Sequence, residues 1–240
     1  MTESFEKTKV AGSIAAGALD EVSNIIKPGV STSEIDKLCY EYINDHKAFS
    51  APLYYRGYPK SCCTSSNHVV CHGIPSEKIL TDGDIVNVDV TAIKDGWHGD
   101  TSRMFIAGEC SVKAKKLIKT TYEAMMEAIK IIKANIKIGN IGHTIQKLVE
   151  AEGFSVVRDF CGHGIGKKFH ESPNVLHYGE KNSGQELKTG MIFTVEPMIN
   201  YGKFETKTLK DGWTAVTKDK SLSAQFEHTV GVTKEGYEIF

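Results

Sequence analysis

Apolar residues recur at helical spacing in the first part of the chain. Up to Lys27 they are interspersed with charged and polar residues, and Pro28-Gly29 stops the pattern. Ser31 and Glu34 then stand at the spacing of a capping box, ahead of a second apolar stripe. The sequence therefore predicts two amphipathic helices, one ending near Lys27 and the other beginning after Ser31.

Short runs of β-branched residues follow. Ile85–Val90 alternates in the way that is typical of a strand, and Thr101–Ile106 is its predicted hairpin partner beyond a loop that contains Lys94–Gly96. The end of the chain is also predicted to be β-rich, with extended runs at Met191–Met198, Trp213–Thr217 and Gln225–Thr233.

Two more helical patterns lie between these strands. Apolar residues keep helical register over Ser111–Lys137 and again over about Ile141–Glu152, where Gly153 ends the second pattern. The first of these predicted helices carries four lysines near its start, namely Lys113, Lys115, Lys116 and Lys119. We interpret them as a solvated helix face, with a docking surface for an acidic partner as the alternative.

A weak internal repeat orders these elements. Three pairs of segments match in the same order: Lys27–Leu38 with Lys137–Leu148, His72–Ile74 with His163–Ile165, and Gly83–Asp89 with Gly190–Glu196. The repeat predicts a duplicated α+β unit within one catalytic domain, residues 1–240, with halves at about 1–110 and 111–240. A duplicated unit that closes on itself would bring strand carboxylates from the two halves face to face.

Composition and charge give no reason to expect DNA or membrane partners. The 240 residues include 29 Lys plus Arg and 30 Asp plus Glu, and 40% of them are hydrophobic. No run approaches the roughly 20 apolar residues that a membrane-spanning helix needs, and the N-terminus does not resemble a secretory signal. The six cysteines form no CxxC pair, and a chain of this size needs no disulfides. We expect a cytoplasmic protein with reduced cysteines.

Acidic residues interrupt strands that otherwise look buried. Asp89 lies inside the first predicted strand, and Asp100 follows at the separation expected for the facing strand of the hairpin. Glu196 repeats the pattern in the second half, and Glu227 lies in the last predicted strand. Neighbouring buried carboxylates repel unless a cation or a proton lies between them. For Asp89 or Asp100 alone, a salt bridge or a turn cap is the alternative interpretation.

His163 adds an imidazole to these four carboxylates. Glycines on both sides of it leave the ring uncrowded and let the backbone approach other groups closely. Mostly oxygen ligands with one nitrogen suit two divalent ions and favour Mn, Fe, Co or Zn over a thiolate-bound structural zinc. Two such ions roughly 3.5 Å apart can hold a hydroxide nucleophile between them at neutral pH.

Other catalytic motifs are weaker. Gly162–Lys167 resembles a phosphate-binding loop, but Cys161 stands where a glycine is needed and Lys168 where a serine or threonine is needed. His170-Glu171 lacks the second histidine of a zinc-peptidase helix, and no nucleophile elbow occurs.

Several ordered motifs together resemble those of type I methionine aminopeptidases. They are Asn87–Val90, His98–Ser102, Cys161–Gly166, Phe169–Glu171, Thr194–Pro197 and Ala224–Thr229, and the resemblance covers essentially the whole chain. Because the chain lacks the zinc-binding N-terminal extension of eukaryotic members and the helical insert of type II, it resembles the short bacterial form. The resemblance implies the pita-bread fold, an α+β fold with pseudo-two-fold symmetry and a central antiparallel sheet flanked by helices.

The resemblance also implies roles for individual residues. The metal ligands would be Asp89, Asp100, His163, Glu196 and Glu227, with Asp100 and Glu227 bridging two ions. His170 would stabilise the tetrahedral intermediate, His72 would contact the peptide beside the scissile bond, and Glu196 would also shuttle protons. A metal-bridged hydroxide would attack the carbonyl after an N-terminal methionine, preferentially when the second residue is small.

The methionine pocket of this family is apolar and aromatic with sulfur nearby. By resemblance its lining is Tyr55, Tyr58, Cys63, Phe169 and Trp213. Pro52 stands where close bacterial relatives carry a cysteine, so the rim of the pocket departs from the family pattern. A monovalent-cation site of some members is matched by Asn67, Val69 and Ser223.

Two other functions fit parts of this pattern. A prolidase or aminopeptidase P would share the metal ligands but usually carries an additional N-terminal domain. An inactive relative that serves as a binding module on ribosomes or chromatin would have lost ligands, whereas all five are present here. We therefore expect a monomeric enzyme that acts on nascent polypeptides, with transient contact to the ribosome.

Overall fold

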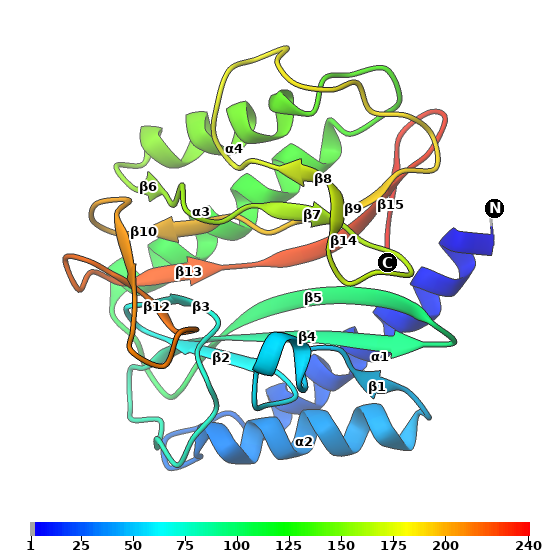
Figure 1. Cartoon of the computed structure of the whole chain (residues 1–240). Helices are drawn as coiled ribbons and strands as arrows, with labels where there is room; N and C mark the ends of the chain where they lie inside the picture. The colour runs from blue at the N-terminus through cyan, green and yellow to red at the C-terminus, as the bar shows by residue number, and fades with distance from the viewer. Residues whose placement is uncertain (1–2) are drawn as a thin grey trace.

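The computed structural model describes residues 3–240, and one curled antiparallel sheet lies at its centre (Figure 1). The strands run in the order β1-β4-β5-β14-β9-β7-β8, while β2 pairs with β4 and β15 with β14. Their bounds are β1 (Phe49–Ser50), β2 (Cys63–Ser66), β4 (Ile85–Lys94), β5 (Trp97–Ile106), β7 (Gly162–Gly164), β8 (Glu171–Val175), β9 (Ile192–Val195), β14 (Glu227–Val232) and β15 (Tyr237–Ile239).

Two small sheets extend one end of the central sheet. One has the order β13-β10-β6 and the other β11-β12-β3. Their bounds are β3 (Val69–Cys71), β6 (Ser155–Val156), β10 (Met198–Asn200), β11 (Thr206–Thr208), β12 (Ala215–Thr217) and β13 (Ser223–Gln225), and a short 3₁₀ turn, η1, spans Tyr55–Gly57. These sheets bring β3 from the first half of the chain against β12 from the second.

Four helices cover the sheet in two pairs (Figure 1). They are α1 (Glu3–Ile25), α2 (Thr32–Asp45), α3 (Val112–Lys130) and α4 (Gly139–Ala151). The first pair packs its apolar stripes on β4 and β5, and the second pair packs on β9 and β14, so that each half has its own apolar core. Helix α1 can approach β5 closely because Gly99 has no Cβ. A Cβ there would lie only 2.1 Å from the backbone nitrogen of Gly12.

The two halves occupy equivalent places about the centre of the sheet. Strands β5 and β14 pair there, with Ser102 opposite Glu227, and β4 and β9 flank them. The aligned carboxylates Asp89 and Glu196 therefore belong to corresponding strands, one inside β4 and the other directly after β9. This order is the one that a duplicated unit would produce, and it agrees with the α+β pita-bread fold expected from the motifs.

The first hairpin confirms the predicted pairing and corrects its length. Lys94 pairs directly with Trp97, so β5 begins four residues before the predicted start at Thr101. The two turn residues, Asp95 and Gly96, have φ of 50° and 79°, the left-handed pair of a tight hairpin turn. The tight turn and the full ladder fix which residues face the interior of the molecule.

Helix α3 ends earlier than its apolar pattern predicts. The prediction ran to Lys137, but the helix stops at Lys130. Asn135 adopts a φ of 69°, and its N–H donates to the carbonyl of Leu187 at 2.8 Å. Lys137 then forms a bridge with Glu186, so pairing with a distant segment replaces the last turns of the predicted helix.

The lysines at the start of α3 lie among partners on the molecule's own surface. Lys115 pairs with Glu109 at 3.0 Å, Lys116 with Glu152 at 2.9 Å and Lys119 with Glu123 at 3.2 Å, while Lys113 lies over the ring of Tyr201. This arrangement favours the solvated helix face over a docking surface. Within residues 3–240 no helix has both the length and the apolar character needed to span a membrane.

The capping box of α2 gives a stability prediction. The Ser31 hydroxyl accepts from the N–H of Glu34 at 3.2 Å, and the Glu34 carboxylate accepts from the N–H of Ser31 at 2.7 Å. We expect Ser31→Ala to lower the free energy of unfolding by about 1 kcal/mol, because the N–H of Glu34 loses its hydroxyl acceptor at the helix start. Urea unfolding measures the effect, with the exposed Ser23→Ala as control. An unchanged midpoint would show that water replaces the cap.

Candidate metal centre and substrate cavity

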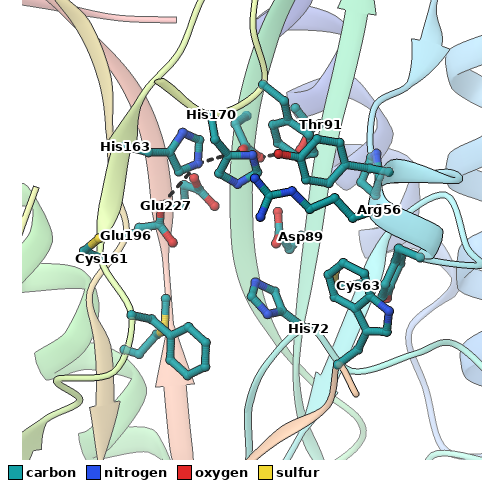
Figure 2. Close-up of a pocket in the computed structure, with 18 of the residues that line it drawn as sticks. Arg56, Cys63, His72, Asp89, Thr91, Cys161, His163, His170, Glu196 and Glu227 are labelled. Carbon is teal, nitrogen blue, oxygen red and sulfur yellow. Dashed lines mark hydrogen bonds and ion pairs between the residues drawn. The ribbon is translucent and has the colours of Figure 1, made fainter. Parts of the chain in front are cut away.

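All five predicted ligands converge on one cavity of about 490 Å³ between the two halves. Asp89 and Asp100 come from β4 and β5, His163 from β7, Glu227 from β14, and Glu196 from the link between β9 and β10. Figure 2 shows the side chains of Asp89, His163, Glu196 and Glu227 directed toward the same space. Residues that lie 138 positions apart in the sequence thus share one site because the sheet pairs β5 with β14.

The closest grouping consists of Asp100, His163 and Glu227. One ligand atom from each of these buried residues lies within 4.8 Å of the others. His163 Nε2 is 3.7 Å from Asp100 Oδ2 and 3.6 Å from Glu196 Oε1, so Glu196 adjoins this group (Figure 2). Asp89 lies beside Asp100 on the neighbouring strand, close enough for their carboxyl groups to interact.

Glycines set the position of His163. A Cβ on Gly162 would lie 2.3 Å from the carbonyl oxygen of Thr194, and a Cβ on Gly164 would lie 2.3 Å from that of Ser172. Only glycine permits strands β8 and β9 to approach β7 this closely. The backbone N–H of His163 donates to the Thr194 hydroxyl at 2.9 Å. The backbone that carries the imidazole is therefore held by close packing from both sides.

Four acidic groups in so small a space disturb one another's ionisation. Burial raises the pKa of Asp89 to about 7 and that of Glu196 to about 8. Burial, with repulsion from neighbouring carboxylates, raises the pKa values of Asp100 and Glu227 well above their usual range. Burial also lowers the pKa of His163 to about 4, so the ring is neutral and can act as a ligand.

These residues fit divalent metal ions. Glu227 Oε1 is buried and has no hydrogen-bond partner among residues 3–240. A buried carboxylate oxygen without a donor is costly, and a cation at that point would remove the cost. Oxygen-rich ligands with one neutral imidazole are the donor set of a catalytic transition-metal site.

Polar neighbours that the sequence did not single out orient the ligands. The Thr91 hydroxyl donates to Asp100 Oδ1 at 2.7 Å, and the Thr194 hydroxyl donates to Glu196 Oε1 at 2.7 Å. The N–H of Glu196 donates to Nε2 of His177, whose pKa burial lowers to about 3. Asp100 and Glu196 therefore keep fixed directions. Thr91 lies two residues after Asp89 on β4, and Thr194 lies two residues before Glu196 at the end of β9, which is the signal that could have found them.

His170 and His72 line different parts of the cavity wall. The ring of His170 lies 4.1 Å from that of His163 and stacks on Tyr55 at 5.2 Å, between centroids. Burial and the nearby His163 lower the pKa of His170 to about 3, so it is neutral at neutral pH. His72 follows β3 with a φ of 56°, and its ring contacts Phe160 edge-on at 5.4 Å.

The five predicted pocket residues all line this same cavity, and Pro52 lies at its edge. Tyr58 meets Trp213 edge-on at 5.1 Å, and its hydroxyl donates to the carbonyls of Cys62 and Gly73. With Cys63 buried beside them, these rings form an apolar wall next to the ligands. Thr91, Arg56, Cys161, Met198 and Asn174 also line the cavity and were not predicted.

The sequence matches the model of metallopeptidase family M24 over residues 6–234. The chain belongs to this family. It is 55% identical to the methionine aminopeptidase of Rickettsia prowazekii over 98% of this chain and 92% of that protein. It is 56% identical to the methionine aminopeptidase of Escherichia coli strain K12, over 99% of this chain and 90% of that protein.

Solved structures place the fold within the same family. A crystal structure of the Rickettsia prowazekii methionine aminopeptidase aligns with a TM-score of 0.98 over 100% of this chain and 97% of that chain. A prolidase from Pyrococcus furiosus aligns with a TM-score of 0.80 at 21% identity, and this chain covers 64% of it. The longer prolidase thus shares the fold of this chain. At 21% identity this likeness is evidence for the fold and not for the activity. Family membership makes the chain a metal-dependent peptidase.

Proposed function

We propose that this chain removes the N-terminal methionine from newly made proteins, preferentially when the second residue is small. One observation carries the proposal: an apolar, aromatic wall adjoins the five predicted metal ligands inside one cavity, and three of those ligands lie close enough together to hold an ion. A methionine side chain suits that wall because its flexible thioether packs well against aromatic rings and sulfur. The names of the relatives that match over nearly the whole chain support the same substrate.

Two divalent ions, drawn from Co, Mn, Fe or Zn, are the proposed cofactors. Asp89, Asp100, His163, Glu196 and Glu227 would hold them, and the four carboxylates would offset the charge of two dications. When bound, the ions would supply an activated water at neutral pH and polarise the scissile carbonyl.

The residues of the chain would do the rest of the chemistry. Tyr58, Cys63 and Trp213 would hold the methionine side chain and exclude water from it. His170, being neutral, would donate a hydrogen bond to the carbonyl oxygen as negative charge develops there. Glu196 would accept a proton and pass it to the leaving amine.

His72 and Phe169 would position the substrate on either side of the scissile bond. His72 reaches the cavity from the end of β3 and would contact the peptide next to that bond. Phe169 contacts Tyr55 at a tilt, with ring centroids 4.9 Å apart, and would close the methionine pocket toward solvent. At Pro52 the pocket rim has no thiol, whereas a cysteine at this position would provide one.

The test is a peptide panel with metal-loaded protein. We expect release of methionine from Met-Ala-Ser and little or none from Leu-Ala-Ser or from a Xaa-Pro peptide. Manganese, cobalt, zinc and anaerobic iron samples would compare the ions. If a Xaa-Pro peptide were cleaved and Met-Ala-Ser were not, the chain would be a prolidase-like enzyme instead.

Further proposals concern partners and place of action. Nascent polypeptides are the proposed substrates, which implies a monomeric, cytoplasmic enzyme with transient ribosome contact. Exposed lysines in the segment 207–220, namely Lys207, Lys210, Lys218 and Lys220, would support contact with an anionic surface. A monovalent cation near Asn67, Val69 and Ser223 is supported by their proximity, since the N–H of Ser223 donates to the carbonyl of Asn67 at 2.8 Å.

A further inference from the structure

Arg56 is a cationic side chain at the mouth of the cavity that the proposed reaction does not use. It lies in η1 between two pocket residues, Tyr55 and Tyr58, and it lines the cavity while remaining exposed. Its guanidinium carbon lies 5.3 Å from the centroid of the Tyr55 ring. Figure 2 shows the guanidinium reaching into the cavity beside His170. The charge of Arg56 is also close enough to His170 to disfavour its protonated form.

The backbone holds this arginine in an unfavourable conformation. Arg56 has a φ of 48°, Tyr54 a φ of 65° and Gly57 a φ of 86°. A side chain in the left-handed region costs about 1 kcal/mol relative to glycine, which would suit this position. The turn is nevertheless fixed, since the N–H of Tyr54 donates to the carbonyl of Tyr58 at 2.8 Å. Non-glycine residues in this conformation concentrate at ligand-binding positions.

Within residues 3–240, Arg56 forms no salt bridge with a carboxylate. Other cationic side chains, such as Lys60, Arg103 and Lys115, do form one. Besides the four carboxylates of the ligand group, two further acidic residues line the cavity. Asp159 accepts a hydrogen bond from the Thr206 hydroxyl at 2.5 Å, and Glu171 begins β8. The guanidinium donors of Arg56 are therefore available to a ligand that enters past His170.

We propose that Arg56 binds a carboxylate of the substrate on the far side of the scissile bond from the methionine, most directly at the third residue. This inference rests on the proposed function, because it takes His170 as the group that faces the scissile carbonyl. The chain beyond that carbonyl then leaves along the wall that carries Arg56. Successive residues of an extended peptide advance by about 3.4 Å, which brings the third residue within reach of the guanidinium.

Four peptides, three with an amidated C-terminus and one with a free C-terminus, test the proposal and separate two sources of the carboxylate. Met-Ala-Asp-amide is compared with Met-Ala-Asn-amide for an acidic side chain, and Met-Ala-Ser with Met-Ala-Ser-amide for a free C-terminus. At low ionic strength we expect kcat/KM to favour the carboxylate member of each pair by roughly threefold to fivefold. The preference should weaken in high salt and should arise from KM rather than kcat.

Substitutions at Arg56 assign that preference to this side chain. Arg56→Gln should abolish it, so that kcat/KM becomes equal within each pair, and Arg56→Lys should keep part of it. The matched control is Arg103→Gln, which removes the same charge from the outer face of β5, where Arg103 pairs with Asp20 at 2.9 Å. An undiminished preference in Arg56→Gln, or none in the wild-type protein, would overturn the role of Arg56. Failure to release methionine from any of the four peptides would overturn the proposed function and this inference together.

Discussion

Replacing His170 with alanine should lower kcat by at least about 100-fold while leaving the metal content intact. His170 lies beside the ligand group, with its ring 4.1 Å from that of His163, but it is not one of the clustered ligands. Its lowered pKa, about 3, keeps the ring neutral throughout the assay range, so it donates a hydrogen bond rather than a proton. Loss of such a donor weakens the transition state more than the bound substrate.

Steady-state kinetics on Met-Ala-Ser and metal analysis of the same samples would measure both halves of this expectation. His170→Asn keeps an N–H donor and should recover part of the lost rate. His143→Ala is the matched control, because it removes a histidine from α4, outside the cavity. Near-normal turnover in His170→Ala, or loss of metal in parallel with activity, would show that His170 does not act on the carbonyl.

Local patterns predicted much of the fold because many strands and helices are specified by residues that lie close together in the sequence. The alternation in Ile85–Val90 and the Asp95-Gly96 turn define a hairpin whose register places Asp89 opposite Ser102 and Asp100 opposite Thr91. The two carboxylates are therefore diagonal neighbours on adjacent strands, as their spacing suggested. The capping box at Ser31 likewise fixes the start of α2.

What the sequence could not supply depends on contacts between distant segments. The run Met191–Met198 looked like one strand, but it divides at Glu196-Pro197, because proline has no N–H to continue the ladder and β10 joins a different sheet. His177 lies 19 residues from Glu196 and reaches it only in the folded chain. Arg56 carried no signal at all, since its role depends on a turn whose geometry the sequence does not reveal.

The geometry of the ligand group also follows from both halves together. Each half alone would carry acidic side chains on a curled sheet with nothing to balance them. Pairing β5 with β14 brings Asp100 and Glu227 into one group with His163, at distances that suit shared cations. The same pairing leaves four buried acids to repel one another whenever cations are missing. Stability and metal binding are therefore coupled in this molecule.

Removing the metal should make the protein less stable as the pH rises. Burial raises the pKa of Asp89 to about 7 and that of Glu196 to about 8, above the values of about 4 in an unfolded chain. Between those values the folded metal-free protein holds protons that the unfolded chain has released, so the free energy of unfolding falls with increasing pH. Stability present at about pH 5 is lost progressively through pH 7 and 8. Bound cations would stabilise the ionised carboxylates and remove this dependence.

Thermal unfolding of chelated and metal-loaded samples at about pH 5.5, 7 and 8.5 tests this expectation, with a fall in Tm of at least about 5 °C across the range for the chelated sample only. Glu227→Gln provides the sharpest comparison, since Glu227 Oε1 is buried without a partner. That variant should bind metal weakly and lose activity, yet its metal-free form should melt higher than the metal-free wild type at high pH. A lower Tm in the metal-free variant would contradict the account, because it would mean that the carboxylate stabilises the fold without any cation.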